Sequence, residues 1–328
     1  MKTKRNFLAI TLASSLSLGL SLAAQAADPG FPTKPVKLIV PYPPGGGSDT
    51  FARTVSPKLS DELGQQFIID NRPGAATIIG ADLVAKSPAD GYTLLLGDNS
   101  TYAVNSSLYK KMPYDALKDF SPVTLTARFA LVLVVNPAVQ AQSVQDFIRL
   151  AKSQPGKLSY GSPGAGSPHH LAMELFAQRA GINLVHVPYK GGAPATQDLL
   201  GGTLPVMMLD FATASQHMKS GKLRALGTAS DKRLPQFADV PTIAESGFPG
   251  YEAWAWQGIV APTGTPPEVI TRLNAALTKV AADPDVKKRM TDLGGDFVPS
   301  TPAAMQTYMR AETAKWARII KDANISIE

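Results

Sequence analysis

The chain has 328 residues, of which 44% are hydrophobic and 18% are charged, with a formal net charge of +6 and no cysteine. Its length and apolar content suffice for two ordinary α/β domains. The lack of cysteine excludes disulfides, thiol nucleophiles and thiolate metal sites. Basic residues are scattered apart from Lys110–Lys111 and Lys287–Arg289, so we expect no nucleic-acid partner.

The first residues have the pattern of an export signal. Three basic side chains within the first five residues precede an apolar run that extends to Leu22, and small residues follow. This order is typical of a cleaved signal peptide, residues 1–26. An N-terminal membrane anchor is the alternative, but a span needs about 20 apolar residues. We expect a periplasmic mature chain, residues 27–328, with net charge +3 and no membrane-inserted segment.

Strand-like and helix-like patterns alternate in the first part of the chain, which favours parallel strands with crossover helices. We expect strands at 36–40, 67–69 and 93–96, each followed by a helix, at 49–63, 77–86 and 101–108. Pro57 should kink or divide the first helix. Consecutive strands at 123–126 and 130–135 then lead to a second group of elements.

The second group repeats the alternation. We expect strands at 158–160, 184–187, 206–209 and 223–227, with helices at 143–153, 168–180, 195–200 and 214–219. Ser143 is placed to cap its helix. The remainder predicts a short capped helix at 239–247, a strand within 254–261, and helices at 266–281, 284–293 and 302–321 that cover a sheet.

Loops rich in glycine and serine follow several predicted strands and open directly into helices. The first is Pro43–Ser48, and 162–167 and 190–194 have the same character. Unpaired backbone N–H groups at a helix start attract anions, and ligands of open α/β sheets bind at strand carboxyl ends. Loops at 72–77, at 97–101 and around Asp210 complete three from each half. A need for tight turns could explain the glycine and serine of any one loop, but it explains all six loops together less well. We therefore expect these loops to bind a small acidic ligand.

Signatures of catalysis and of nucleotide binding are incomplete. The sequence contains no G-x-S-x-G elbow, no phosphate loop and no complete dinucleotide glycine pattern. His170 and Glu174 have the spacing of two metal ligands, which is too few, so we expect no metal and no cofactor. A secreted hydrolase of small esters or amides is the alternative, and it would use Ser162, Ser167 and His169.

Many motifs, in chain order, resemble the Bug or TctC family of periplasmic solute-binding proteins. They are Val40–Asp49 (VPYPPGGGSD), Asn71–Ala75 (NRPGA), Pro88–Leu94 (PADGYTL), Pro113–Asp115, His186–Gly191 (HVPYKG), Asp198–Gly202 (DLLGG), Gly221–Leu226 (GKLRAL), Asp239–Thr242, Ala261–Pro266 and Lys315–Trp316. The resemblance covers nearly all of the mature chain. It implies a type II periplasmic-binding-protein fold, in which two α/β lobes close on a ligand, and service to a tripartite tricarboxylate transporter.

The resemblance also implies where the ligand binds. We assign residues 27–127 and 228–328 to lobe 1 and residues 128–227 to lobe 2. The family binds mostly small organic acids through backbone amides, hydroxyls and waters. The matching loops give these contacts: Pro43, Pro44, Gly45, Gly46, Gly47, Ser48, Ala76, Thr77, Ile78, Asn99, Ser100 and Thr101 from lobe 1, and Ser162, Gly164, Ala165, Gly166, Ser167, Gly191, Gly192, Ala193 and Asp210 from lobe 2. The sequence departs from the family at 75–78, where a further glycine is common.

Asp210 is the unexpected member, because a carboxylate repels an anionic ligand. It either orients backbone groups, binds an amine on the ligand, or accepts a hydrogen bond from water. Arg53, Arg72 and Arg128 are each candidates to clamp a carboxylate, and the sequence does not choose among them. We expect a receptor, not an enzyme, that delivers a small organic acid to membrane subunits; a receptor that signals to a sensor partner is a further alternative.

Overall fold

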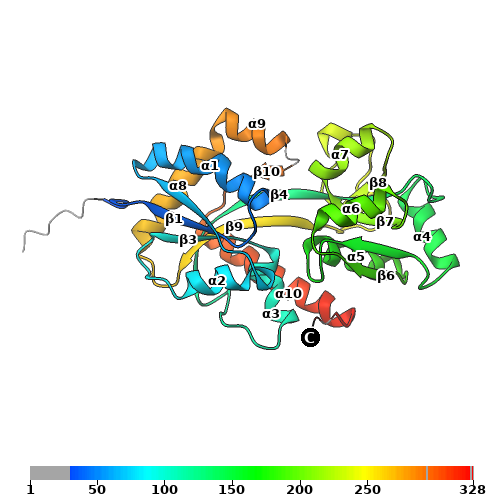
Figure 1. Ribbon diagram of the computed structural model, residues 1–328, viewed down its shortest axis with the longest axis horizontal. Coiled ribbons are helices and arrows are strands. Elements are labelled where there is room, and N and C mark those ends of the chain that lie inside the picture. Colours follow the sequence, from blue (N-terminus) through cyan, green and yellow to red (C-terminus); the bar gives the residue numbers. More distant parts are fainter. Residues whose placement is uncertain (1–29, 293–294, 326, 328) are drawn as a thin grey trace, which may run out of the picture.

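The computed structural model describes residues 30–292, 295–325 and 327, so the predicted signal peptide, 1–26, lies outside the described part. The described chain forms a mixed sheet of ten strands. Its main order is β2 (Phe67–Asn71), β1 (Val36–Val40), β3 (Thr93–Asp98), β9 (Trp254–Pro262), β4 (Phe120–Val135), β7 (Val206–Asp210), β5 (Ser159–Ser162) and β6 (Val185–Pro188), while β8 (Arg224–Thr228) and β10 (Gly295–Phe297) pair with β4. Figure 1 shows β4 and β9 running between two groups of elements.

The register of the strands makes the carboxyl ends of both groups face one junction. β1, β2 and β3 are parallel, and Asp98 at the end of β3 lies opposite the beginning of antiparallel β9. β5, β6 and β7 are also parallel, and Asp210 at the end of β7 lies opposite Leu131 of antiparallel β4. β9 begins at Trp254, which pairs with Ala130 of β4. Both sets of strands therefore end beside the same short stretch of β4 and β9.

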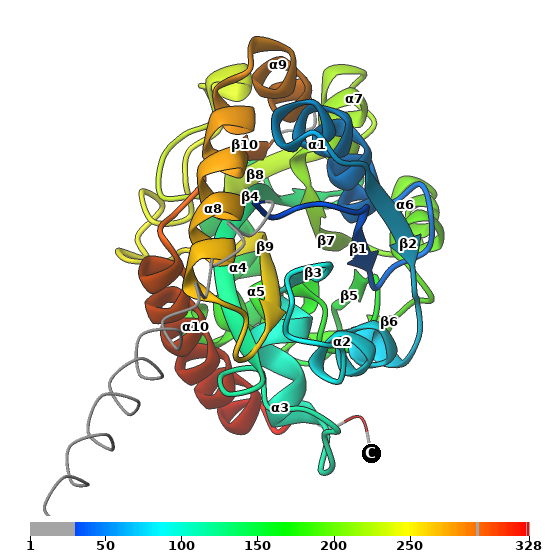
Figure 2. The same ribbon diagram turned by 90° about the vertical axis from the view of Figure 1, so that its left-hand side faces the viewer.

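Helices cover both faces of each group of strands. In the first group, α1 (Gly47–Leu63), α8 (Pro267–Ala282) and α9 (Pro284–Asp292) bury one face, and α2 (Ile78–Ala85), the π-helix η2 (Ser100–Val104), α3 (Asn105–Leu108) and α10 (Pro302–Asp322) bury the other (Figure 2). In the second group, α4 (Val144–Ser153) and α5 (Pro168–Ala180) lie opposite α6 (Gly192–Leu200) and α7 (Phe211–Lys219). Within the described residues, none of these helices has both the length and the apolar character of a membrane span.

Strand β4 belongs to the core of both groups. Its residues Leu131 and Leu133 pack in the cluster that contains α4 and α5, whereas Val132 and Val134 pack with α6 and α7. Side chains that alternate between two buried faces are typical of a central strand. The first cluster continues through Trp256 of β9 to α10. The two groups of elements are therefore joined by one continuous apolar core.

Most predicted elements are confirmed, including the Ser143 cap, whose side chain accepts from the N–H of Asp146. The separate strands expected at 123–126 and 130–135 were wrong. They form one strand, β4, because the residues between them pair with both β9 and β10. Pro57 does not divide its helix, because α1 continues unbroken from Gly47 to Leu63.

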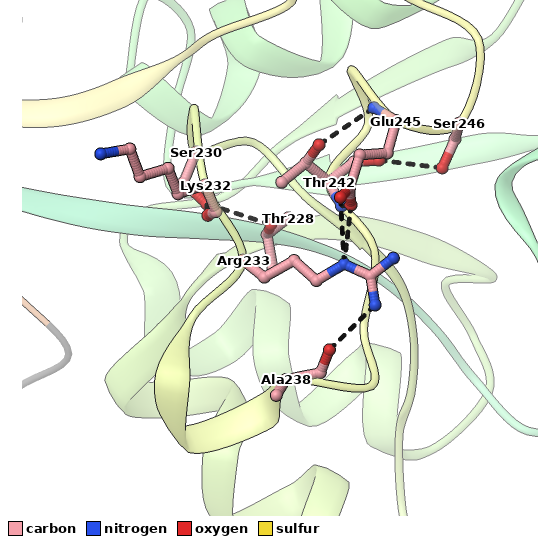
Figure 3. A network of polar contacts seen from close by, with 8 residues as sticks. All are labelled: Thr228, Ser230, Lys232, Arg233, Ala238, Thr242, Glu245 and Ser246. Carbon is pink, nitrogen blue, oxygen red and sulfur yellow. Dashed lines mark hydrogen bonds and ion pairs between the residues drawn. The ribbon is translucent and has the colours of Figure 1, made fainter.

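The helix expected at 239–247 was also wrong, although its capping residues are present (Figure 3). The N–H of Glu245 donates to Thr242 Oγ1 at 3.0 Å, and Glu245 Oε2 accepts from the N–H of Thr242 at 2.8 Å. Arg233 Nε donates to the same carboxylate oxygen at 2.8 Å. The N–H of Ile243 donates to the carbonyl of Thr228 at 2.8 Å, which ties the segment to the end of β8. These tertiary bonds hold the segment as a series of turns.

Candidate functional site

The structure places the predicted site residues at the carboxyl ends of β1, β2, β3, β5, β6 and β7. We define the first loop set as residues 43–48, 76–78 and 99–101, and the second loop set as residues 162–167, 191–193 and 210. The two sets belong to strand ends that meet at the same stretch of β4 and β9. Residues far apart in the sequence are thereby brought to one junction, and their role as ligand contacts stays a prediction.

Asp49 holds the glycine loop of the first set, residues 43–48, in place. The sequence did not reveal this role of Asp49. Asp49 Oδ2 accepts from the N–H of Gly45 at 2.9 Å and from Arg53 Nε at 2.8 Å, and its Oδ1 accepts from Asn71 Nδ2 at 3.0 Å. Asp49 is 2% exposed. The hydrogen bond from Arg53, assisted by those from Gly45 and Asn71, outweighs burial and lowers the pKa of Asp49 to about 2.

This arrangement leaves part of the glycine loop free to receive an anion. Helix α1 begins at Gly47 with Gly46 as its N-cap, and no side chain caps it. In the described part of the chain, the N–H groups of Gly46, Gly47 and Ser48 have no protein acceptor. The positive end of the helix dipole adds to the attraction for a negative charge. The three N–H groups at this helix start are therefore free to bind an anion, as predicted. The N–H of Gly45 is not free, because it donates to Asp49.

Gln257 of β9 extends this corner of the site and was not anticipated from the sequence. Its Nε2 donates to Ser48 Oγ at 2.8 Å, and both residues are buried. Gln257 Oε1 is buried and has no hydrogen-bond partner among the described residues. Buried polar atoms are nearly always satisfied by protein or water. This amide oxygen is therefore free to accept a hydrogen bond from water or from a ligand.

A second network joins the other loops of the first set. Tyr42 donates its hydroxyl proton to Asp98 Oδ2, and Asp98 Oδ1 accepts from the N–H of Thr101 at 3.2 Å. Thr101 Oγ1 lies 2.9 Å from Thr77 Oγ1. Burial raises the pKa of Asp98 above its usual value despite these hydrogen bonds. The buried amide of Asn99 is occupied by the backbone of β9, since it donates to Trp254 O at 3.0 Å and accepts from Trp256 N–H at 2.8 Å.

The loop before α2 has an unusual backbone where the sequence departs from the family pattern. Ala75, Ala76 and Thr77 have φ values of 44°, 48° and 80°. Side chains other than glycine are strained in this left-handed region. Asn105 Nδ2 donates to the carbonyl of Ala76 at 2.8 Å and helps to hold the conformation. The loop thus adopts a backbone suited to glycine without containing one at these positions.

The main loop of the second set is held by two stacked imidazoles. His186 Nε2 lies 2.7 Å from Ser162 Oγ, and the N–H of Gly166 donates to His170 Nδ1 at 3.0 Å. The rings of His170 and His186 are nearly parallel with centroids 3.7 Å apart. One ring therefore contacts each end of the loop. Ser167 caps α5, because its hydroxyl accepts from the N–H of His170.

Both imidazoles are neutral in this arrangement. His170 Nδ1 accepts a hydrogen bond from a backbone N–H, so that nitrogen carries no proton. Burial, and then repulsion from His186 once acid protonates that ring, lower the pKa of His170 to about 3. Burial lowers the pKa of His186 to about 4. Burial also raises the pKa of Glu174, which accepts a hydrogen bond from Tyr160 beside the stack.

The groups required for the alternative chemistries are not assembled. The predicted hydrolase residues do not pair with one another, since Ser167 caps a helix and His169 lies beside Asp210. Ser162 does contact an imidazole, that of His186, but this serine is fully buried. His170 Nε2 is 4.0 Å from Glu174 Oε1. Across the described residues, no cluster of three or more His, Asp or Glu side chains is placed to hold a metal ion.

The three candidate clamp arginines each contact a carboxylate of the chain itself. Arg53 binds Asp49, and Arg72 Nε donates to Asp70 Oδ1 at 2.9 Å. The guanidinium of Arg128 lies 4.7 Å from the ring centre of Trp254 and 3.8 Å from a carboxylate oxygen of Glu252. Arg53 and Arg72 are thereby held by carboxylates of the chain, whereas Arg128 Nε is buried and has no hydrogen-bond partner among the described residues. The donors that the junction offers an anion are therefore backbone N–H groups, hydroxyls and Arg128.

Asp210 is placed differently from the other acidic residues of the junction. It ends β7 and occupies the N-cap position of α7, but its side chain makes no capping hydrogen bond. Its Oδ2 lies 3.1 Å from His169 Nε2, and its side chain is 42% exposed. Burial alone raises the pKa of Asp210, but the attraction of the neighbouring His169 ring outweighs burial and leaves that pKa below its usual value.

The second loop set touches α3 of the first group of elements at Gly166. Its φ is +75°, and a Cβ placed there would lie 2.3 Å from Leu108 Cδ1. Only glycine fits this backbone beside the leucine without a shift. Loop 191–193 rests on the same loop, since the N–H of Gly191 donates to the carbonyl of Pro163 at 3.0 Å. The second loop set is thus packed both internally and against α3.

Two hollows of the surface lie away from the loop sets. One, of about 450 Å³, lies between α1 and β2 and includes Arg53 and Ile68. The other, of about 600 Å³, includes Phe31, Tyr92 and Arg272. Neither contains a residue of the two loop sets. The junction, and not these hollows, combines free backbone donors with uncommitted polar side chains.

Comparison with known proteins identifies the family of the chain. The family model described as "Tripartite tricarboxylate transporter family receptor" matches residues 51–325. A UPF0065 protein from the tcbD–tcbE intergenic region of Pseudomonas sp. (strain P51) is 41% identical over 98% of this chain and 95% of its own length.

Two solved structures from Rhodopseudomonas palustris have the same fold. Rpa4515, solved with adipate, is 37% identical with a TM-score of 0.81 and covers 90% of this chain and 100% of its own. MatC, solved with bound malate, is 31% identical with a TM-score of 0.77 and covers 88% of this chain and 100% of its own. The matched family is described as one of transporter receptors and not of enzymes. The chain therefore belongs to the tripartite tricarboxylate transporter receptor family and has the type II periplasmic-binding-protein fold.

Proposed function

We propose that this protein is a periplasmic receptor that captures a small organic carboxylate and delivers it to the membrane subunits of a tripartite tricarboxylate transporter. The observation that carries the proposal is the meeting of two loop sets with free backbone donors at one junction. Relatives solved with adipate and with malate support a carboxylate as the ligand.

The proposed mechanism is closure of two lobes around the acid. Lobe 1 comprises residues 27–127 and 228–328, and lobe 2 comprises residues 128–227. The first loop set would bind one side of the ligand and the second the other, and β4 and β9 would act as the hinge. Ligand binding shifts such a protein toward its closed form, which the transporter then recognises. Delivery of the signal to a sensor partner is the alternative use of the same closure.

A thermal-shift screen of the mature protein tests the ligand class. We expect stabilisation by at least one acid in a panel of mono-, di- and tricarboxylates that includes aromatic members, because a ligand of the native state raises the free energy of unfolding. Neutral sugars and amides serve as controls. Stabilisation by the neutral compounds alone would overturn the assignment. Loss of uptake of the stabilising acid in cells that lack the protein separates transport from sensing.

A further inference from the structure

Asp210 and His169 form a pair at the junction, and neither side chain caps a helix or bonds to the backbone of the described residues. Asp is a favoured N-cap residue because its carboxylate can bond the free N–H groups of the first turn. Asp210 occupies that position before α7 yet makes no capping bond, and its side chain remains 42% exposed. The carboxylate is therefore available at the end of β7, where the two groups of strands meet.

His169 is buried, and its contact with Asp210 falls short of a well-formed hydrogen bond. The residue is 8% exposed, and neither Nδ1 nor Nε2 has a hydrogen-bond partner of good geometry among the described residues. Its Nε2 lies 3.1 Å from Asp210 Oδ2, a distance that allows an ion pair. Buried polar nitrogens are rarely left without a partner. A partner from outside the described chain, a ligand or water, is thus expected beside this pair.

The chemistry of the pair restricts which ligand group fits there. An ionised carboxylate only accepts hydrogen bonds, and it repels a second carboxylate. The attraction of His169 keeps the pKa of Asp210 low, so the group faces the ligand as an acceptor at neutral pH. The group that fits is a hydroxyl or an ammonium that donates a hydrogen bond.

From these contacts we infer that Asp210, oriented by His169, selects carboxylic acids that also carry a hydroxyl or ammonium group. The inference rests on the proposed function, because the carboxylate of the same ligand must bind the backbone donors of the junction. His169 acts as a positioning residue, since it contacts the carboxylate of Asp210. A pair that only tethered α5 to β7 would not distinguish between acids.

Titration calorimetry with matched acids tests the inference on the mature protein. Succinate, malate and aspartate share one carbon skeleton and differ in a hydrogen, hydroxyl or ammonium group. Adipate with its 2-hydroxy and 2-amino derivatives forms a longer series. In one of the series we expect a substituted acid to bind at least about tenfold more tightly than the unsubstituted acid. The two substituted arms identify which donor the site prefers.

Variants then assign the preference to the pair. Asp210→Ala should reduce the preference to less than about threefold. Asp210→Asn keeps the shape of the side chain and should abolish a preference for ammonium more strongly than one for hydroxyl. His169→Gln should reduce the preference without abolishing carboxylate binding. Asp285→Asn, the same change at a side chain that is 88% exposed on α9, is the matched control and should leave all affinities unchanged.

The outcomes separate this inference from the proposed function. Equal or tighter binding of both unsubstituted acids by the unchanged protein overturns the inference alone, as does a preference that survives both Asp210 variants. Failure of every carboxylate to bind overturns the proposed function and the inference together. Thermal unfolding of each variant shows whether it is folded, and the isosteric Asp210→Asn carries the test if Asp210→Ala is not.

Discussion

The two loop sets are built on the same plan of strand ends but are held by different chemistry. The first is fixed by carboxylates: Asp49 binds the glycine loop, and Asp98 joins Tyr42 to Thr101. The second is fixed by the neutral rings of His170 and His186. Asp49, whose pKa is about 2, stays an ionised acceptor down to acidic pH, whereas an imidazole is an acceptor only while it is unprotonated. The comparison teaches that the two sides of the junction respond differently to acid.

Removal of the carboxylate that holds the first loop set should have the largest effect on stability. Asp49→Ala leaves the donors on Gly45, Arg53 and Asn71 without their acceptor. We expect the free energy of unfolding to fall by about 3 kcal/mol, measured by urea denaturation. Asp61→Ala, the same change at an exposed position of α1, should cost less than about 0.5 kcal/mol. Equal losses in the two variants would contradict the role of Asp49.

The stack of His170 and His186 should make the protein less stable as the pH falls. An unfolded histidine titrates near pH 6.5, but the pKa of folded His170 is about 3 and that of His186 is about 4. The unfolded chain therefore binds more protons between these values, so stability is complete above pH 6.5 and declines as pH falls toward 4. Asp49, with its pKa of about 2, contributes to acid lability only below about pH 4.

Unfolding curves between pH 4 and 7 measure this decline. His170→Asn removes the titrating ring and can still accept from the N–H of Gly166 through its amide oxygen, so its stability should depend less on pH. His217→Asn, a histidine of α7 outside the stack, provides the control. An unchanged slope in His170→Asn would show that the stack does not set the acid response.

The smallest expected effect lies in the strained loop of the first set. Ala76→Gly relieves a positive φ and should raise the free energy of unfolding by up to about 1 kcal/mol. The same change in the helix that follows, Ala85→Gly, should lower it by about 0.5–1 kcal/mol. Thermal and urea unfolding check both signs. Destabilisation of similar size in both variants would mean that the loop is not strained.

The order of strands and helices could be predicted from the sequence because it depends on local sequence patterns. Apolar runs, glycine junctions and prolines at helix starts marked most strands and helices within a few residues, and family motifs indicated the fold. The continuous β4 was missed because its middle is held by pairing with β9 and β10. The turns at 239–247 were missed because a local cap signal competes with the bond between Ile243 and Thr228.

The partners of the loops were harder to predict than the loops themselves. Asp49 stands in the first turn of its helix, which is a recognisable signal, but its bond to Asn71 depends on β2 pairing with β1. His170 was noticed beside Glu174 as a poor metal pair, and nothing local indicates that it stacks on His186 across two elements. Contacts between distant segments follow from tertiary packing, so a single sequence contains no pattern that reveals them.

Gly166 has a thermodynamic consequence for the ligand-free protein. The loop that contains it lies against Leu108, which is 7% exposed, and close to Val104, which is fully buried. Separating this loop from α3 and η2 would bring their apolar atoms into water, at a cost of about 25 cal/mol for each Å² exposed. This buried contact therefore stabilises the ligand-free arrangement of the loop against α3. If the two proposed lobes close on a ligand, part of the apolar contact between them is already made before the ligand binds.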